Sequence, residues 1–256
     1  MGRARGLTVA AAAVLLAAGA LPAVTQRAGA APGLGSDISF PQCGQAYPAT
    51  PAFAIIGVND GRPFTANPCL VSEFRWAAAS GTVEFYMNTA NPGVSQAAAF
   101  GYGADAARDA YSYATSHVAA GPGRQWWLDV ETANSWSGDT GANTSVIAGA
   151  LAYLRGQQVD VGIYSTRYQW GLITGGAQIP SVPNWVPGAR SAAEAPGFCA
   201  AGRSFTGGPV VMTQFTTAFD FDYLCPGVAP PPPLPPPPLL TQLLQNILNW
   251  LAGRKH

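Results

Sequence analysis

The sequence predicts an α/β fold, a compact, somewhat irregular (β/α) barrel of the TIM-barrel type. Between an apolar N-terminal stretch and a proline-rich tail, residues 31–228 remain, enough for one domain with a full core. In this part of the chain, short β-rich apolar runs alternate with helical stretches, which is typical of a mainly parallel sheet with covered faces. Polar residues also fall within or at the ends of the expected strands, and in a barrel they would meet at the rim where active sites lie. They are Asp37, Asn59, Asp60, Asn88, Asp129, Glu131, Tyr164 and Gln214.

The expected elements follow one another in an almost regular alternation. Apolar runs rich in β-branched and aromatic residues indicate strands, and longer stretches with apolar residues at helical spacing indicate helices. The expected strands are 36–40, 53–59, 82–88, 125–131, 161–166, 184–187, 209–216 and 219–224, and the expected helices are 70–79, 95–117, 144–157 and 168–172.

The first 30 residues read as a secretory signal peptide cleaved near Ala30. They contain an arginine-bearing head, an apolar run over residues 7–24 and the small-residue site Ala28-Gly29-Ala30. The apolar run is almost long enough to span a bilayer, so an uncleaved anchor is the alternative. The many alanines and the absence of a basic stop favour cleavage, and we expect a secreted or cell-envelope protein.

The C-terminal part departs in composition from the rest of the chain. Residues 229–238 form a proline-rich spacer, expected to be a stiff polyproline II segment. Residues 239–256 carry leucine and isoleucine at helical spacing and predict an amphipathic helix. This helix has three open roles: it docks on the domain, it self-associates, or it lies on a membrane or envelope surface.

The charge and the histidine content of the chain exclude two classes of function. Removing Arg3, Arg5 and Arg27 with the signal changes the formal net charge from 0 to 0 − 3 = −3. The basic footprint of a nucleic-acid-binding protein is therefore absent. The chain has two histidines, His117 in an expected helix and His256 near the C-terminus, so a histidine-based hydrolase is excluded. We expect no cofactor and no metal.

The four cysteines lie in the exported part of the chain, where disulfides persist. Sequence alone permits three pairings. We expect Cys43 to pair with Cys69 and Cys199 with Cys225, because each pair lies within one end of the domain. A zinc site is the weaker interpretation, because the chain has no C-x-x-C spacing.

The stretch "WWLDVETANSWS" at residues 126–137 places two acids in apolar, aromatic surroundings. Asp129 and Glu131 are two positions apart, so in a strand their side chains point to one face. Neighbouring acids repel, and in a partly dry site one of them tends to keep its proton. Such a pair suits a site in which one carboxyl group keeps its proton and acts as an acid while the other is its charged partner. The alternative is structural, with the acids capping a helix or bonding a loop amide.

Three short motifs, "GSDISFPQ", "LDVE" and "VGIYST", follow one another along the expected strands. At these motifs the chain resembles the family 25 glycoside hydrolases, the lysozyme-type muramidases. The resemblance covers about residues 35–227. "GSDISFPQ" looks like the family's opening G-x-D-x-S-x-x-Q, "LDVE" matches its D-x-E motif, and "VGIYST" matches its G-I-Y-S strand. "FAIIGVNDG", "VEFYMN", "NWVPGA", "MTQF" and "FDFDYL" are similar to further family strands. The order and spacing of these motifs carry the resemblance.

The resemblance implies an acidic quartet at Asp37, Asp129, Glu131 and Asp220. Glu131 would be the general acid, and Asp129 would steady the substrate's N-acetyl group as it attacks the anomeric carbon. A one-step shift of the alignment would exchange Asp220 with Asp222. The acid would be kept protonated by a close carboxylate and by an aromatic wall of Trp126 and Trp127. The substrate-binding set is Asp222, Tyr86, Tyr164, Gln214, Asp60 and Trp185.

The resemblance implies a secreted enzyme that cleaves peptidoglycan-type glycan between amino sugars, with cell-wall glycan as its partner. Several strands depart from the family pattern, with Pro187 and Gly188 in "NWVPGA" and Met212 and Thr213 in "MTQF". These departures favour the alternative, a non-catalytic glycan-binding or envelope-interaction protein on the same barrel. Asp220 and Asp222 have a second interpretation as calcium ligands.

Asn143-Thr144-Ser145 matches a glycosylation sequon. We interpret Asn143 instead as the N-cap of the helix expected over residues 144–157, because asparagine is a favoured N-cap residue.

Overall fold

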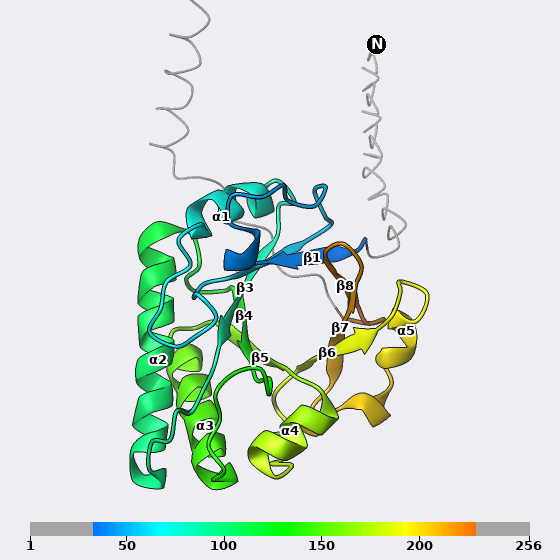
Figure 1. Ribbon diagram of the computed structural model, residues 1–256. Helices are drawn as coiled ribbons and strands as arrows, with labels where there is room; N and C mark the ends of the chain where they lie inside the picture. Colours follow the sequence, from blue (N-terminus) through cyan, green and yellow to red (C-terminus); the bar gives the residue numbers. More distant parts are fainter. Residues whose placement is uncertain (1–32, 229–256) are drawn as a thin grey trace, which may run out of the picture. The chain divides into compact units, whose positions relative to one another are not determined.

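The computed structural model describes residues 33–228, which form a closed barrel of eight strands in chain order (Figure 1). β1 to β7 are parallel, and β8 runs antiparallel to both β7 and β1. The predicted α/β barrel is therefore confirmed, and β8 is one source of its irregularity. The strands are β1 (Gly35–Ile38), β2 (Ala54–Gly57), β3 (Val83–Asn88), β4 (Gln125–Asp129), β5 (Asp160–Tyr164), β6 (Asn184–Ala189), β7 (Val210–Thr216) and β8 (Asp220–Leu224).

The helices between the strands differ widely in length. α2 and α3 lie side by side against one part of the barrel (Figure 1). By contrast, β1 is followed only by the 3-10 turn η1, and β6 only by the four-residue α5 and the 3-10 turn η2. The helical elements are η1 (Phe40–Gln42), α1 (Leu70–Ala78), α2 (Gln96–His117), α3 (Thr140–Gly156), α4 (Arg167–Thr174), α5 (Ala195–Phe198) and η2 (Ala201–Arg203).

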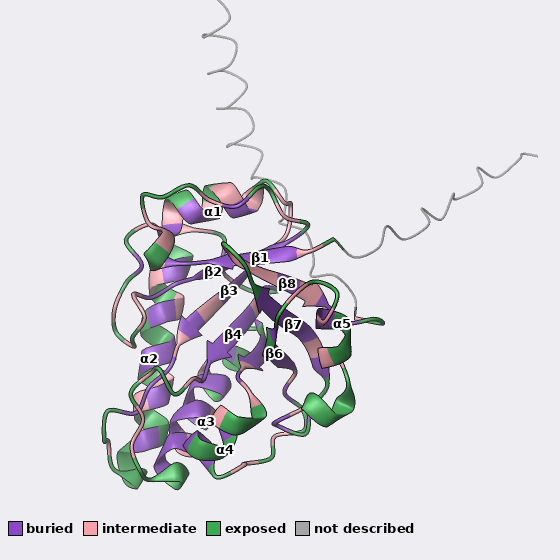
Figure 2. Cartoon of the chain, turned by 45° about the vertical axis from the view of Figure 1, so that its right-hand side comes forward, coloured by how far each residue is buried: buried purple, intermediate pink, exposed green. Residues whose placement is uncertain are grey.

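Helices α2 and α3 pack so closely that their backbones approach each other, because small residues lie between them. A Cβ atom added to Gly103 would lie 1.8 Å from the Val146 carbonyl oxygen, and one added to Gly149 would lie 2.0 Å from that of Phe100. Buried alanines line the same face of α2, and both helices show buried residues on one side and exposed residues on the other (Figure 2). The small residues of the two sequences thus bring α2 and α3 into close contact with each other.

Helix α3 begins four residues earlier than expected. Its N-cap is Asp139, whose carboxylate accepts a hydrogen bond from the Ala142 backbone N–H at 3.0 Å. Asn143 lies inside the helix and is fully buried; its side chain donates to the Ser137 and Ile173 carbonyl oxygens. The predicted N-cap at Asn143 is wrong, because Asp139 supplies the capping oxygen one turn earlier.

The two tryptophans of β4 point to opposite sides of the sheet. Trp127 belongs to the apolar cluster inside the barrel together with Trp185 and Ile55. Trp126 packs in the cluster between sheet and helices, and its indole N–H donates to the Ala120 carbonyl oxygen at 3.0 Å. The expectation that both tryptophans wall the acid pair is therefore wrong for Trp126, because neighbouring residues of a strand face opposite sides.

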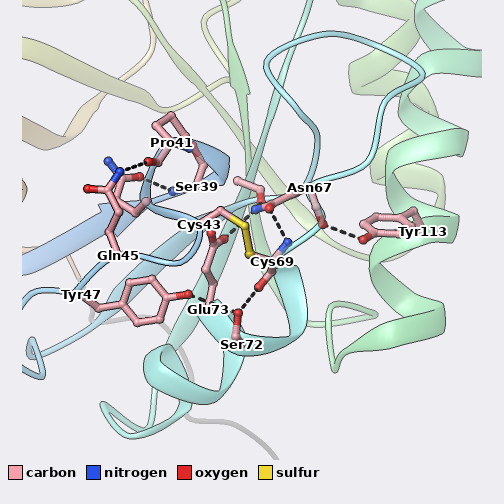
Figure 3. Close-up of a disulfide and its surroundings, with 12 residues drawn as sticks. Ser39, Pro41, Cys43, Gln45, Tyr47, Asn67, Cys69, Ser72, Glu73 and Tyr113 are labelled. Atoms are coloured by element: carbon pink, nitrogen blue, oxygen red, sulfur yellow. Dashed lines mark hydrogen bonds between the residues drawn. A yellow bond between two sulfur atoms is a disulfide. The ribbon is translucent and has the colours of Figure 1, made fainter.

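Both expected disulfides are present, Cys43–Cys69 and Cys199–Cys225. The first joins the segment after η1 to the start of α1 (Figure 3). Beside it, the buried carboxylate of Glu73 accepts a hydrogen bond from the Asn67 side-chain amide at 2.6 Å. Burial raises the pKa of Glu73 to about 7, and the Asn67 hydrogen bond acts in the opposite direction. The disulfide and this network together hold the loops that follow β1 and β2.

Three predictions lie outside the described residues: the signal peptide 1–30, the spacer 229–238 and the amphipathic helix 239–256. Among residues 33–228, none of the helices combines the length and the apolar character that a membrane crossing requires.

Candidate active site

A cavity of about 400 Å³ opens at the end of the barrel where the parallel strands finish. Asn88, Asp129 and Tyr164 are the last residues of β3, β4 and β5, and all three line it. Because β8 is antiparallel, its first residue, Asp220, lies at this end and pairs in register with Asp37. The lining contains four carboxyl groups and no lysine, arginine or histidine. It consists of Asp37, Ser39, Phe40, Pro41, Tyr86, Asn88, Asp129, Glu131, Tyr164, Trp185, Gln214, Thr216 and Asp220.

Asp129 ends β4 and is 6% exposed. Its Oδ2 accepts a hydrogen bond from the Asn88 side-chain amide, whereas its buried Oδ1 has no partner among the described residues. Burial raises the pKa of Asp129 well above its usual range, and the charge of Glu131 raises it further. Asp129 therefore offers the cavity one unpaired acceptor oxygen in a carboxyl group that ionises reluctantly.

Glu131 follows β4 by two residues, and its side chain lines the same cavity. Its Oε1 accepts a hydrogen bond from the Gln169 amide at 3.2 Å, and its backbone oxygen accepts one from the Trp136 indole at 2.9 Å. Burial raises the pKa of Glu131, the Gln169 bond lowers it, and the charge of Asp220 raises it. The two acids of the D-x-E motif thus meet at one cavity, as their spacing predicts.

Asp37 is held by a chain of hydrogen bonds across the barrel. The Tyr164 hydroxyl donates to Gln214 Oε1 at 2.7 Å, and Gln214 Nε2 donates to Asp37 Oδ2 at 2.8 Å. The pKa of Asp37 is raised to about 7 by burial and by the charge of Asp220, and the Gln214 hydrogen bond acts against this rise. This chain fixes three of the predicted site residues in one arrangement.

The two acids of β8 lie at different depths. Asp220 lines the cavity, and its Oδ1 accepts a hydrogen bond from the Thr216 hydroxyl at 2.6 Å. Asp222 is fully buried below it, and neither of its oxygens has a hydrogen-bond donor among the described residues. Burial raises the pKa of Asp222 well above its usual range, and the charges of Asp37, Glu84 and Asp220 add to this. Asp220 is thus the β8 acid that lines the cavity.

The remaining predicted site residues divide into two groups. Tyr86, Tyr164, Gln214 and Trp185 line the cavity, with the Trp185 ring 4.6 Å from that of Tyr164 in a T-shaped contact. Asp60 is outside the lining. It lies half-buried after β2, in a loop closed by a hydrogen bond from its backbone N–H to the Thr65 hydroxyl at 3.0 Å.

Asn88, one of the polar strand-end residues expected to meet at one rim, ends β3 directly opposite Asp129 and lines the cavity. Sequence reasoning did not include several other residues that the structure brings to the site. Gln169 reaches Glu131 from α4, a contact between elements that has no local signature. Ser39, Phe40, Pro41 and Thr216 complete the lining. No group of three or more histidine, cysteine, aspartate or glutamate side chains within residues 33–228 is arranged to hold a metal ion.

Comparison with known proteins agrees with this fold. A curated relative, "Probable GH family 25 lysozyme 4" of Dictyostelium discoideum, is 36% identical over 64 residues, which is 23% of this chain and 30% of the relative. The muramidase of Trichobolus zukalii superposes with a TM-score of 0.55 at 19% identity, covering 76% of this chain and 94% of that one. The bacterial lysozyme of Streptomyces coelicolor gives a TM-score of 0.56 at 18% identity, covering 77% and 93%. These two structures share the fold.

The family described as "Lys-1: Lysozyme-like protein 1" matches residues 56–188, which are 133 of the 256 residues. Because this match spans more than half of the chain, the protein belongs to the Lysozyme-like protein 1 family.

Proposed function

We propose that this protein is a glycoside hydrolase that cleaves peptidoglycan-type glycan between its amino sugars, as a muramidase does. The family membership supports a lysozyme-type activity. The cavity supports it independently, because carboxyl groups in a shared site are what glycosidic cleavage requires. A lining without lysine, arginine or histidine leaves the carboxyl groups as the acid and base groups of the site.

The unpaired Oδ1 of Asp129 is the observation that carries this proposal. A buried acceptor without a donor is costly, so a ligand that brings an N–H group to it gains binding energy. The N-acetyl group of an amino sugar carries such an N–H group. Asp129 then holds the acetamido group while its carbonyl oxygen attacks the anomeric carbon, and the bond to the leaving oxygen breaks as Glu131 transfers its proton to that oxygen.

Water completes the reaction. It adds to the anomeric carbon, the acetamido group is released from that carbon, and the proton lost by water returns to Glu131. A general acid must hold its proton near neutral pH, and burial and the charge of Asp220 both raise the pKa of Glu131 in the required direction. Asp37 and Asp220 line the rest of the acidic cavity around the sugar. The side chains of Tyr86, Tyr164 and Gln214 form hydrogen bonds with the sugar.

The same proposal includes the place of action. The N-terminal sequence favours export, which brings the enzyme to the cell wall or the extracellular space where peptidoglycan is found. We propose that the proline-rich spacer and the C-terminal amphipathic sequence provide attachment to the envelope or to a second copy of the chain. The match to the curated relative covers only 30% of that protein, and the substrate therefore rests on the chemistry of the cavity.

The experiment measures release of reducing sugar from purified peptidoglycan by the full chain, by Glu131→Gln and by Asp129→Asn. We expect Glu131→Gln to lower the rate by about 10²- to 10⁴-fold, because only the transferable proton is lost. Cosedimentation with insoluble peptidoglycan should show that this variant still binds. Asp105→Asn, at an exposed carboxylate on α2, is the matched control and should keep the parent's rate.

A Glu131→Gln protein that digests peptidoglycan as fast as the parent would show that Glu131 is not the acid. A parent that cosediments with peptidoglycan but releases no sugar would instead support the glycan-binding function.

A further inference from the structure

A second set of acidic side chains lies below the cavity and has no part in the proposed reaction. Glu84, the second residue of β3, is 2% exposed, and Asp222 on β8 is fully buried. Each is two residues away from a cavity-lining residue on its own strand, Tyr86 and Asp220 respectively. Side chains two apart in a strand face the same side, so both acids point into the barrel.

Glu84 is hydrogen-bonded to Trp127, whose ring lies beneath the cavity and is called the floor of the site. Its Oε2 accepts a hydrogen bond from the Trp127 indole N–H at 2.6 Å. Trp127 precedes Asp129 by two residues on β4, and its ring lies 5.6 Å from that of Trp185, which lines the cavity. A Cβ atom on Gly162 would lie 2.2 Å from the Trp127 ring, so the neighbouring strand leaves the indole no room to move toward it. The ring is thus fixed by one polar contact and by close packing.

Asp222 is surrounded by acids. The charged groups that act on it are Asp37 from β1, Glu84 from β3 and Asp220 from its own strand. Asp129 and Glu131 from β4 and the hydroxyl groups of Tyr86 and Tyr164 belong to the cavity above, whose lining includes no basic side chain. Ionising buried neighbouring carboxyl groups without a cation is costly, so Asp222 retains its proton. A protonated Asp222 presents an O–H group to the neighbouring Asp37, although neither Asp222 oxygen has a hydrogen-bond partner among the described residues.

We propose that Glu84 is a positioning residue, which holds the Trp127 ring beneath the site and keeps the proton on Asp222, the acid that neighbours Asp37. This inference rests on the proposed hydrolase function. Burial raises the pKa of Glu84 to about 7, and the Trp127 hydrogen bond acts against this rise. As the pH passes this value, Glu84 gains the negative charge that opposes loss of the Asp222 proton.

Two variants of the full chain separate the two roles of Glu84. Glu84→Gln keeps an acceptor for the Trp127 indole but cannot ionise, and Glu84→Leu loses both functions. Without the Glu84 charge, Asp222 should lose its proton at lower pH. In Glu84→Gln we therefore expect the alkaline limb of the pH profile of kcat/KM to move to lower pH by roughly one unit, with KM unchanged. In Glu84→Leu, kcat/KM should also fall about tenfold at the optimum, because the indole N–H loses its partner. Glu194→Gln, at an exposed glutamate paired with Arg190, is the matched control and should keep the parent's profile.

A readout that does not need activity follows the Trp127 indole resonance by NMR in full chain labelled with ¹⁵N-tryptophan, assigned with Trp127→Phe. In the parent, this resonance should titrate with a midpoint near the Glu84 pKa of about 7. In Glu84→Gln it should stay constant over the same pH range. If the parent cleaves no peptidoglycan, the proposed function fails while this titration still tests the link between Glu84 and Trp127. An indole that does not titrate in the parent, or an alkaline limb that Glu84→Gln leaves in place, would overturn the inference.

Discussion

Asn88 and Asp129 end neighbouring strands directly opposite each other, and the Asn88 amide donates a hydrogen bond to the Asp129 carboxylate. The Asn88 backbone is held separately. Asn59 Nδ2 donates to the Asn88 carbonyl oxygen, and Asn59 Oδ1 accepts from the Asn88 N–H, both at 3.0 Å. Asn88 is therefore a fixed donor that leaves Oδ1 of Asp129 as the oxygen available to a ligand.

The substitution Asn88→Leu should lower kcat/KM on peptidoglycan by about 10- to 100-fold, the usual range for loss of a hydrogen bond to a charged group. The end of β3 should keep its conformation in this variant, because Asn59 forms hydrogen bonds only with the backbone of residue 88. Thr89→Val is the matched control, since Thr89 donates to the Asp129 backbone oxygen and not to its carboxylate. Equal losses of activity in the two variants would count against a specific role for the Asn88 amide.

The pH dependence of hydrolysis should respond in opposite directions to two changes beside Glu131. Its pKa is raised by burial and by the charge of Asp220, and lowered by the Gln169 hydrogen bond. Activity falls as the pH rises through the pKa of the acid, because the proton is then lost. Asp220→Asn should therefore move the alkaline limb of kcat/KM to lower pH, and Gln169→Leu should move it to higher pH. Rate profiles of the two variants check this, and shifts of the same sign would contradict the assignment of Glu131 as the acid.

The position of the acid pair could be predicted from sequence because it depends on local geometry. Asp129 and Glu131 share one face by the two-residue period of strands. The same period places Trp127, two residues before Asp129, inside the barrel and Trp126 outside it, so only one of the two tryptophans expected to wall the acids faces them. Strand alternation therefore contains more information on the site than the motif alone.

Other parts of the site depend on contacts that no local pattern reveals. Asp220 reaches the rim because β8 runs antiparallel, which is a property of the closed sheet. Gln169 reaches Glu131 from the first turn of α4. The loop of Asp60 turns away through its own Thr65 contact, although this residue follows a strand as a site residue would. These arrangements follow from tertiary packing.

Folding stability should fall as the pH rises, in part through Glu73. Its pKa is about 7 in the folded protein against an ordinary value of 4.5, so its contribution is fully present below pH 4.5 and is lost as the pH rises through about 7. This shift corresponds to at most about 3 kcal/mol.

The substitution Glu73→Gln isolates this contribution. Glutamine keeps the acceptor for Asn67 and cannot ionise, so urea unfolding at pH 5 and pH 8 should show a smaller loss of stability than in the parent. The control Glu194→Gln removes an exposed carboxylate and should leave the difference between the two pH values almost as in the parent. An unchanged difference in Glu73→Gln would mean that this carboxyl group does not titrate in the range.

The floor of the site should tolerate no side chain at residue 162. A Cβ atom there would lie 2.2 Å from Trp127 Cζ3 and 2.5 Å from its Cε3, and the ring is already held by Glu84 and packed against Trp185. Gly162→Ala should therefore destabilise the protein by about 1–3 kcal/mol through overpacking. It should also lower the rate of hydrolysis, because a displaced Trp127 moves the β4 segment that carries Asp129.

Gly156→Ala is the matched control for this substitution. Gly156 is the last residue of α3, and a Cβ atom there meets no atom within 4 Å. The alanine should leave activity unchanged and add up to about 1 kcal/mol of stability, since it has the higher helix propensity. Thermal unfolding and kcat/KM of both variants provide the comparison. A Gly162→Ala protein as stable and as active as Gly156→Ala would show that the Trp127 ring has room to retreat, and that the floor of the cavity is not held rigidly from below.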